Sequence, residues 1–269
     1  MTATLGIDLA SKASRTGVAV IGWDTSPPTL LALSVGTAAD GTVLHDKWLY
    51  TTAVGLRSWP EITKVGIDAP FGWPAPFVQA LAGYATAPNW PSGMDNSRAQ
   101  FERRLTDNVV RERTGVTPLA VSVDKIGYCA MRCAVVLTEI ADREGPEAVA
   151  RDGSGLACEV YPDPALRFWT RDAETTAGPR ESYKGKAKIA HRDRLLARLL
   201  EQLPLQDPHG LLDVARQSPL DDYLDALVCA LVARACELEL TSRPAPEQRE
   251  LALQEGWIHL PDEPLEAMR

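Results

Sequence analysis

The sequence predicts an α/β fold in which one mixed five-stranded sheet lies between layers of helices. Three short apolar runs near the start are separated by tight polar breaks, which is typical of an antiparallel meander. A fourth apolar run follows a helical pattern, and a strand reached through a helix is most simply parallel to its neighbour. The first breaks are too short for the crossovers of a fully parallel sheet. With strands counted along the chain, we expect the order 3-2-1-4-5.

The first part of the chain supplies four of these strands. Thr4–Ala10, Gly17–Trp23 and Thr29–Val35 form the predicted meander, because each is short, apolar and bounded by polar residues or prolines. Residues 42–57 carry apolar side chains at helical spacing. Lys64–Ala69 is therefore the fourth strand.

A change of character at residue 70 predicts a helical insertion over about residues 70–120, within a single domain that covers residues 1–269. This segment is rich in proline and arginine, and we expect helices at Pro74–Ala82 and Ser97–Val110. Long segments of this kind are usually functional or cover a site.

After the insertion the chain returns to core elements. We predict helices, a fifth strand, a polar loop, a linker and a short final strand, in this order: helix Lys125–Ala141, strand Gly155–Tyr161, loop Arg171–Gly185, helix Lys186–Leu203, helix Pro219–Leu240, linker Thr241–Pro246 and strand Glu255–Leu260.

Composition limits the classes of function. The chain has 269 residues, and its net charge of −8 argues against a broad non-specific grip on nucleic acid, although a local basic groove stays open. Five cysteines without a CxxC pair predict reduced thiols and a cytoplasmic location. Neither a signal peptide nor an apolar run of the ~18 residues that a membrane span requires is recognisable, so we expect no membrane partner.

The tripeptide Gly-Ile-Asp closes two of the predicted strands, at residues 6–8 and 66–68. If these strands are neighbours, Asp8 and Asp68 face each other at the same edge of the sheet. Adjacent carboxylates repel each other unless one is protonated or a cation lies between them. The alternatives are a turn in which Asp8 accepts backbone hydrogen bonds, and a plain strand end at Asp68, which precedes Ala-Pro.

A further acidic cluster opens the last long helix. Ser218 and Asp221 fit an N-cap and its capping-box acid, so Asp221 needs no chemical role. Asp222 and Asp225 lie three residues apart, hence on one face, and Asp225 falls in the apolar sector. Because isolated burial of an ionised carboxylate is costly, Asp225 has either a functional role or an arginine partner.

These acids predict a metal site. We expect Asp8, Asp68, Asp222 and Asp225 to be metal ligands and catalytic residues, and Glu159, in the fifth strand, to be a supporting catalytic residue unless it faces solvent. Hard oxygen ligands select Mg²⁺ or Mn²⁺. Two such ions can activate a water and stabilise the leaving oxygen in phosphodiester cleavage.

Basic side chains near these acids are candidates for contacting the phosphate backbone of a substrate. The simpler interpretations are a solvated helix face around residues 184–198 and, at Arg104, a helical ion pair with Asp107. The predicted substrate-binding residues are Lys12, Arg15, Arg104, Lys184 and Lys186.

Several motifs together resemble a family known as domain of unknown function 429, over nearly the whole chain. They are GIDLASKASRTGVAVI, VGIDAPFGWP, the Arg-Leu-Thr-Asp of residues 104–107, CEVYPDPAL, YKG, DDYLDALVCALVA and EGWI. That family is generally placed in the ribonuclease H-like superfamily and described as a predicted nuclease. The resemblance implies that fold, whose strand order matches the predicted one, and it suggests that activity.

Within the superfamily, Asp8 is similar to the first-strand acid, and Asp222 and Asp225 are similar to the paired helix acids of resolvases. Asp68 lies where resolvases usually carry Glu, so its side chain is one methylene shorter.

The favoured function is a metal-dependent nuclease or phosphodiesterase that acts on DNA or RNA, with a homodimer as a candidate assembly because resolvase-like relatives often dimerise. One alternative is a nucleotide-binding protein of the actin-like ATPase kind, although such proteins usually have two lobes and glycine-rich phosphate loops. Another is a non-catalytic module that kept the fold.

Overall fold

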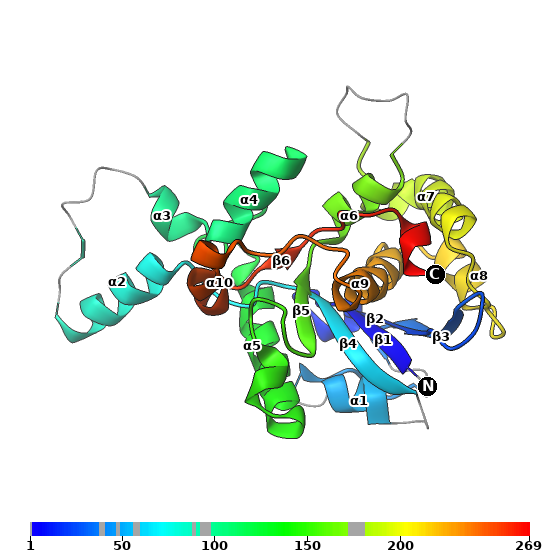
Figure 1. Ribbon diagram of the computed structural model, residues 1–269, viewed down its shortest axis with the longest axis horizontal. Coiled ribbons are helices and arrows are strands. Elements are labelled where there is room, and N and C mark those ends of the chain that lie inside the picture. Colours follow the sequence, from blue (N-terminus) through cyan, green and yellow to red (C-terminus); the bar gives the residue numbers. More distant parts are fainter. Residues whose placement is uncertain are drawn as a thin grey trace.

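The computed structural model describes residues 2–37, 41–46, 49–55, 60–87, 90–91, 98–171 and 181–269. In this part of the chain a mixed six-stranded sheet of order β3-β2-β1-β4-β5-β6 lies between helices on both faces (Figure 1). The predicted α/β class and the order of the first five strands are confirmed. The count differs because the short final strand joins the sheet as its sixth member.

The strands pair as the lengths of their connections predict. The first three are antiparallel neighbours, and β4, β5 and β6 continue the sheet in parallel. The strands are β1 (Thr2–Asp8), β2 (Gly17–Gly22), β3 (Thr29–Val35), β4 (Glu61–Asp68), β5 (Ala157–Val160) and β6 (Ile258–His259).

Each face of the sheet has its own apolar core. On one face, alternate residues of β1, β2 and β4 pack against two helices, α1 (Leu49–Gly55) and α5 (Gly127–Glu144). The other face packs against four helices: α6 (Pro162–Trp169), α7 (Ile189–Gln202), α8 (Leu211–Gln217) and α9 (Asp222–Glu237). Strands covered on both faces read as continuous apolar runs, which explains their composition.

Helix α9 lies directly on the strands, because glycines allow its backbone to approach. A Cβ on Gly6 would lie 2.2 Å from the Ala226 carbonyl oxygen, and one on Gly66 would lie 2.4 Å from that of Cys229. A Cβ on Gly17 would likewise lie 2.5 Å from the backbone oxygen of Asp222. These contacts are one helical turn apart and fall on three neighbouring strands, so α9 runs across the sheet rather than along it.

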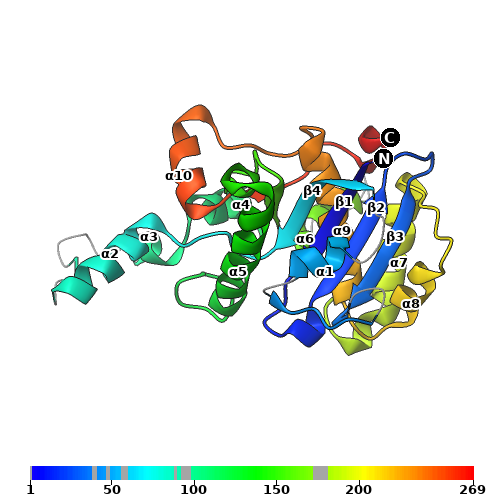
Figure 2. The same cartoon turned by 90° about the horizontal axis from the view of Figure 1, so that it is seen from below.

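The insertion after β4 contains α2 (Ala75–Thr86), α3 (Ala99–Glu102) and α4 (Leu105–Thr114), and α10 (Arg249–Glu255) packs against it. Its first part forms an arm that extends away from the sheet through α2 and α3 (Figure 2), whereas the α4 helix that follows packs against β6. The prediction of one continuous helix over Ser97–Val110 was wrong. The chain breaks at Arg103 and Arg104, both extended, and residues 92–97 lie outside the described residues.

Other differences concern helix starts. Pro162 ends the strand as expected, but it also begins α6, because proline suits the first turn of a helix. Helices α8 and α10 were not predicted. Helix α9 begins at Asp222 rather than at Pro219, with Asp221 as its N-cap residue, while Ser218 accepts a hydrogen bond from the Leu220 amide at 3.1 Å.

Five short 3-10 turns complete the described elements, at Ala13–Arg15, Pro146–Val149, Lys186–Lys188, Pro246–Gln248 and Leu265–Met268. The predicted loop Arg171–Gly185 and helix 42–57 fall partly outside the described residues. All five cysteines are free thiols and buried, as expected. No helix among the described residues is both long and apolar enough for a bilayer span.

Candidate functional site

Two carboxylates meet at the ends of β1 and β4. Asp8 and Asp68 are partners in the parallel register of these strands. Side chains alternate between the faces of a sheet, and Gly6 and Gly66, two residues earlier, touch α9. Both carboxylates therefore lie on the α9 side. This arrangement explains the repeated tripeptide. The glycine lets α9 approach the strand, the isoleucine packs in the core of the opposite face, and the aspartate ends the strand beside α9.

Within the described residues, neither carboxylate receives a side-chain hydrogen bond or an ion pair, and Asp8 is only 9% exposed. Burial raises the pKa of Asp8 well above its usual range, and the negative charges of Asp225 and Asp68 raise it further. Burial also raises the pKa of Asp68 to about 7, against the opposing charge of Lys184. A cation placed between these groups would relieve both effects.

The first turn of α9 brings two more acids to this edge. Asp225 is 1% exposed, and its Oδ1 accepts a hydrogen bond from the Tyr183 hydroxyl at 2.7 Å, while Lys184 Nζ contacts its Oδ2. Burial still raises the pKa of Asp225. The predicted alternative of an ion-pair partner is therefore what the structure contains, although the partner is a lysine rather than an arginine.

Asp222 is held by a second cation. Its Oδ2 accepts hydrogen bonds from Arg15 Nε at 2.8 Å and from Arg15 Nη2 at 2.5 Å. The same Nη2 lies 3.6 Å from Asp221 Oδ1. Of the four predicted ligands, Asp8, Asp68 and Asp225 lie within electrostatic reach of one another and of Lys184. Asp222 is also buried and acts on Asp8, but it is already paired with Arg15.

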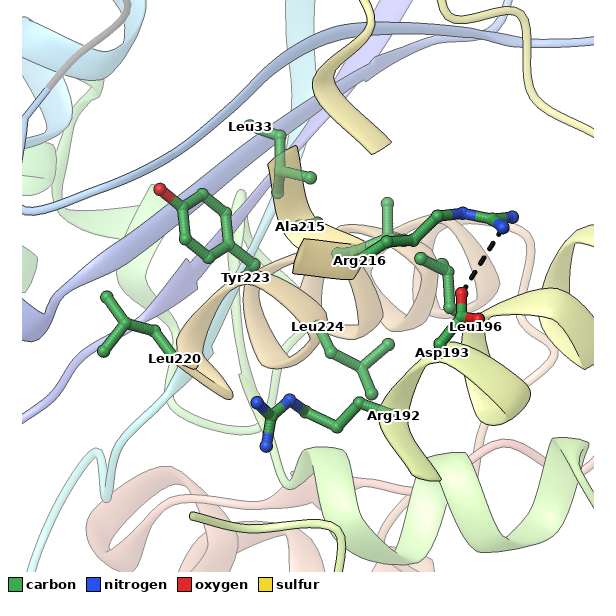
Figure 3. Close-up of a pocket in the computed structure, with 10 residues that line it drawn as sticks. Leu33, Arg192, Asp193, Leu196, Ala215, Arg216, Leu220, Tyr223 and Leu224 are labelled. Carbon is green, nitrogen blue, oxygen red and sulfur yellow. Dashed lines mark ion pairs between the residues drawn. The ribbon is translucent and has the colours of Figure 1, made fainter. Parts of the chain in front are cut away.

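The backbone around Lys184 is fixed by a buried arginine of α7. Arg192 Nη1 donates to the carbonyl oxygens of Tyr183 at 3.0 Å and Gly185 at 2.7 Å, and its Nη2 donates to that of Ser218 at 3.0 Å. Figure 3 shows Arg192 reaching past Leu224 toward the start of α9. The cavity drawn there has a volume of about 10 Å³, room for roughly one water, so it is no substrate pocket.

Glu159 lies on the opposite face of the sheet and is buried. It is the register partner of Ile67, and both of its oxygens accept hydrogen bonds from Arg104, at 2.7 and 2.8 Å. Its Oε2 also accepts from the Phe71 amide at 2.9 Å, which fixes the turn that follows Asp68. Arg104, 2% exposed, bridges to Asp107 at 2.9 Å, as the ion-pair interpretation predicted.

The remaining predicted cations lie on the surface. Lys12 and Lys186 are exposed, Lys12 directly before the turn that carries Arg15 and Lys186 at the start of the turn that leads into α7. Neither lysine pairs with Asp8, Asp68 or Asp225 in the described part of the chain.

A family model provides the comparison with known proteins. The model, described as "Protein of unknown function (DUF429)", matches residues 6–249, which include both strand-end acids and both acids of α9. The chain belongs to the DUF429 family. No curated protein and no solved structure matches it.

Two residues of this DUF429 protein were missed as parts of the site. The hydroxyl of Tyr183 binds Asp225, and Asp163, in the first turn of α6, carries a charge that helps to raise the pKa of Asp68. Asp163 also pairs with Arg167 at 2.8 Å. The signal for both was present, because the motif YKG places Tyr183 next to Lys184 and the motif CEVYPDPAL places Asp163 four residues after Glu159.

The donor set of the DUF429 protein fits a hard divalent cation in its chemistry. Asp8, Asp68 and Asp225 offer only oxygen, and together with the Lys184 ammonium they leave two negative charges when ionised. As the side chains stand, no three Asp, Glu, His or Cys residues in the described ranges form a metal-holding group. Arg15 and Lys184 bind the acids of α9 instead.

Proposed function

We propose that this DUF429 protein is a nuclease, a phosphodiesterase that depends on Mg²⁺ or Mn²⁺. The observation that carries the proposal is the pair of strand-end carboxylates, Asp8 and Asp68. They are in register, without a partner among the described residues, and within electrostatic reach of Asp225. Such an arrangement is costly in a metal-free protein, since like charges repel and burial disfavours ionisation.

The topology of the sheet supports the proposal that the site lies in a ribonuclease H-like fold. An antiparallel meander is extended by parallel strands, and a helix crosses the sheet and carries acids to the ends of the two central strands. A likeness of fold does not establish an activity, so the chemistry rests on the carboxylates themselves.

Asp8, Asp68 and Asp225 would hold the metal, which supplies an activated water and stabilises the charge of the leaving oxygen when bound. Asp222 orients Arg15 at the rim. Glu159 and Arg104 fix the turn after Asp68, and so act on its position rather than on the substrate. A net charge of −8 restricts contact with nucleic acid to local cations such as Lys12 and Lys186.

One observation favours a second candidate, a binding module without catalysis. Arg15 and Lys184 already neutralise part of the acidic cluster through internal ion pairs. A protein that had lost its metal could be held together in this way.

Metal binding separates the two candidates. Calorimetric titration with Mn²⁺ and Mg²⁺ at pH 8 is followed by cleavage assays on branched, duplex and single-stranded DNA and RNA. Asp8→Asn is expected to lose both metal binding and cleavage. Glu61→Gln, at the exposed far end of β4, removes the same charge and is expected to keep both. Absence of metal binding in the wild type removes the nuclease proposal and leaves the binding module.

A further inference from the structure

Lys184 places an ammonium group among the buried carboxylates. Its Nζ contacts Asp225 Oδ2 and lies 3.9 Å from Asp221 Oδ2. It is also within electrostatic reach of both Asp8 and Asp68. A positive charge is therefore already present at the point where the proposed function requires a metal.

The backbone that carries this ammonium is fixed, but the side chain has room to move. Arg192, which is 5% exposed, binds the carbonyl oxygens on both sides of Lys184, and Tyr183 is anchored on Asp225. The Lys184 side chain itself is 45% exposed. It can leave Asp225 by rotation about its own bonds, with no movement of the loop.

A metal bound by Asp225 would lie in direct contact with the Lys184 ammonium. The ammonium occupies one carboxylate oxygen and Tyr183 the other, so the carboxylate has no oxygen without a donor. Two cations cannot share one oxygen at contact distance without strong repulsion. A metal bound at Asp225 Oδ2 therefore displaces the ammonium from that oxygen.

Resting on the proposed function, we infer that Lys184 is an internal counter-ion, which occupies the place of a cation in the metal-free protein and is displaced from Asp225 by the metal. After displacement, the anchored backbone keeps the ammonium at the rim of the site. There it is placed to bind a phosphate oxygen of the substrate.

Calorimetry on charge variants tests this inference. Lys184→Met is expected to bind Mn²⁺ at pH 8 at least about tenfold more tightly than the wild type, a gain of about 1.4 kcal/mol. Lys186→Met removes the same charge two residues away and is expected to leave Mn²⁺ affinity unchanged. Circular dichroism of both variants checks that the fold is retained, and Lys184→Gln repeats the test with a polar side chain.

The outcomes distinguish this inference from the proposed function. Tighter binding in Lys184→Met than in a wild type that also binds Mn²⁺ supports the counter-ion. Binding in that variant alone overturns both, because the metal then fails to displace the ammonium in the wild type. Equal or weaker binding in Lys184→Met, with a wild type that binds Mn²⁺, overturns the counter-ion and leaves the nuclease proposal standing. No binding in either protein overturns both.

A second measurement uses the unaltered protein. A small amine-acylating ester is applied with and without saturating Mn²⁺, and modified lysines are quantified by mass spectrometry. Displacement exposes the ammonium, so Mn²⁺ is expected to increase acylation of Lys184 relative to Lys186. An unchanged ratio in protein that calorimetry shows to bind Mn²⁺ contradicts the inference.

Discussion

Replacement of Asp68 by asparagine is expected to stabilise the metal-free protein at alkaline pH. Burial raises the pKa of Asp68 from the usual 3.8 to about 7, and each pKa unit corresponds to 1.36 kcal/mol. A shift of about three units sets an upper limit of about 4 kcal/mol. Because Asp68 interacts with the charges of Asp225 and Lys184, we expect about 1–3 kcal/mol in practice.

The sign follows from proton binding. A carboxyl whose pKa is higher in the folded state holds its proton in the fold when the unfolded chain has already lost it. Wild-type stability therefore falls as the pH rises from about 4 to about 7, and Asp68→Asn lacks this loss. The advantage of the variant is expected to be full at pH 8.5 and to shrink toward zero near pH 4.

Urea denaturation followed by circular dichroism measures the difference, in buffers with a chelator. Glu61→Gln, at the other end of the same strand, is expected to show no such pH-dependent gain. Mn²⁺ at about 1,000 times its dissociation constant is expected to reverse the order, because it adds about 4.1 kcal/mol to the wild type, more than the advantage of the variant. A variant that is less stable than the wild type at pH 8.5 without metal would refute the reasoning.

Three further substitutions and one control test the frame of the site. Arg104→Met leaves buried carboxylates without their partner and is expected to cost about 3–5 kcal/mol in urea denaturation; a loss below about 1 kcal/mol contradicts the buried network. Gly6→Ala forces a methyl group into the α9 backbone and is expected to lower stability by at least about 2 kcal/mol in thermal melts. Gly83→Ala, in a helix with open space around it, is expected to be neutral or stabilising, and equal effects at the two glycines would speak against close contact with α9. Tyr183→Phe removes one donor to Asp225 and is expected to cost about 1–3 kcal/mol, measured by urea denaturation; an unchanged midpoint means that the hydrogen bond contributes nothing.

The arrangement of the sheet could be predicted because it depends on local signals. The lengths of the apolar segments and of the connections between them distinguish hairpins from helical crossovers. This distinction predicted which strands lie next to β1. Once β1 and β4 are parallel neighbours, the repeated tripeptide brings Asp8 and Asp68 to one edge. The burial of Asp225 followed from helical periodicity.

The partners of these groups could not be predicted, since they depend on side chains far apart in the sequence. The cost of burying an ionised carboxylate suggested an arginine partner as the alternative for Asp225, whereas a loop fixed by Arg192 supplies Lys184. The face on which Glu159 lies depends on the register of β5, which a four-residue strand does not reveal. The pairing of β6 could not be predicted either, because this strand has only two residues and pairs with the edge of β5.

The three glycines beneath α9 make the placement of its acids insensitive to the apolar side chains nearby. The backbone of α9 contacts the backbone of the strands at these glycines, so their missing side chains set the distance between helix and sheet. A slip of the helix by a single residue would turn its acidic face by about 100° and carry the carboxylates away from the strand ends. Sequences that diverge widely in the core of this fold can therefore still deliver the same charges to the same spot, provided that these small residues are kept.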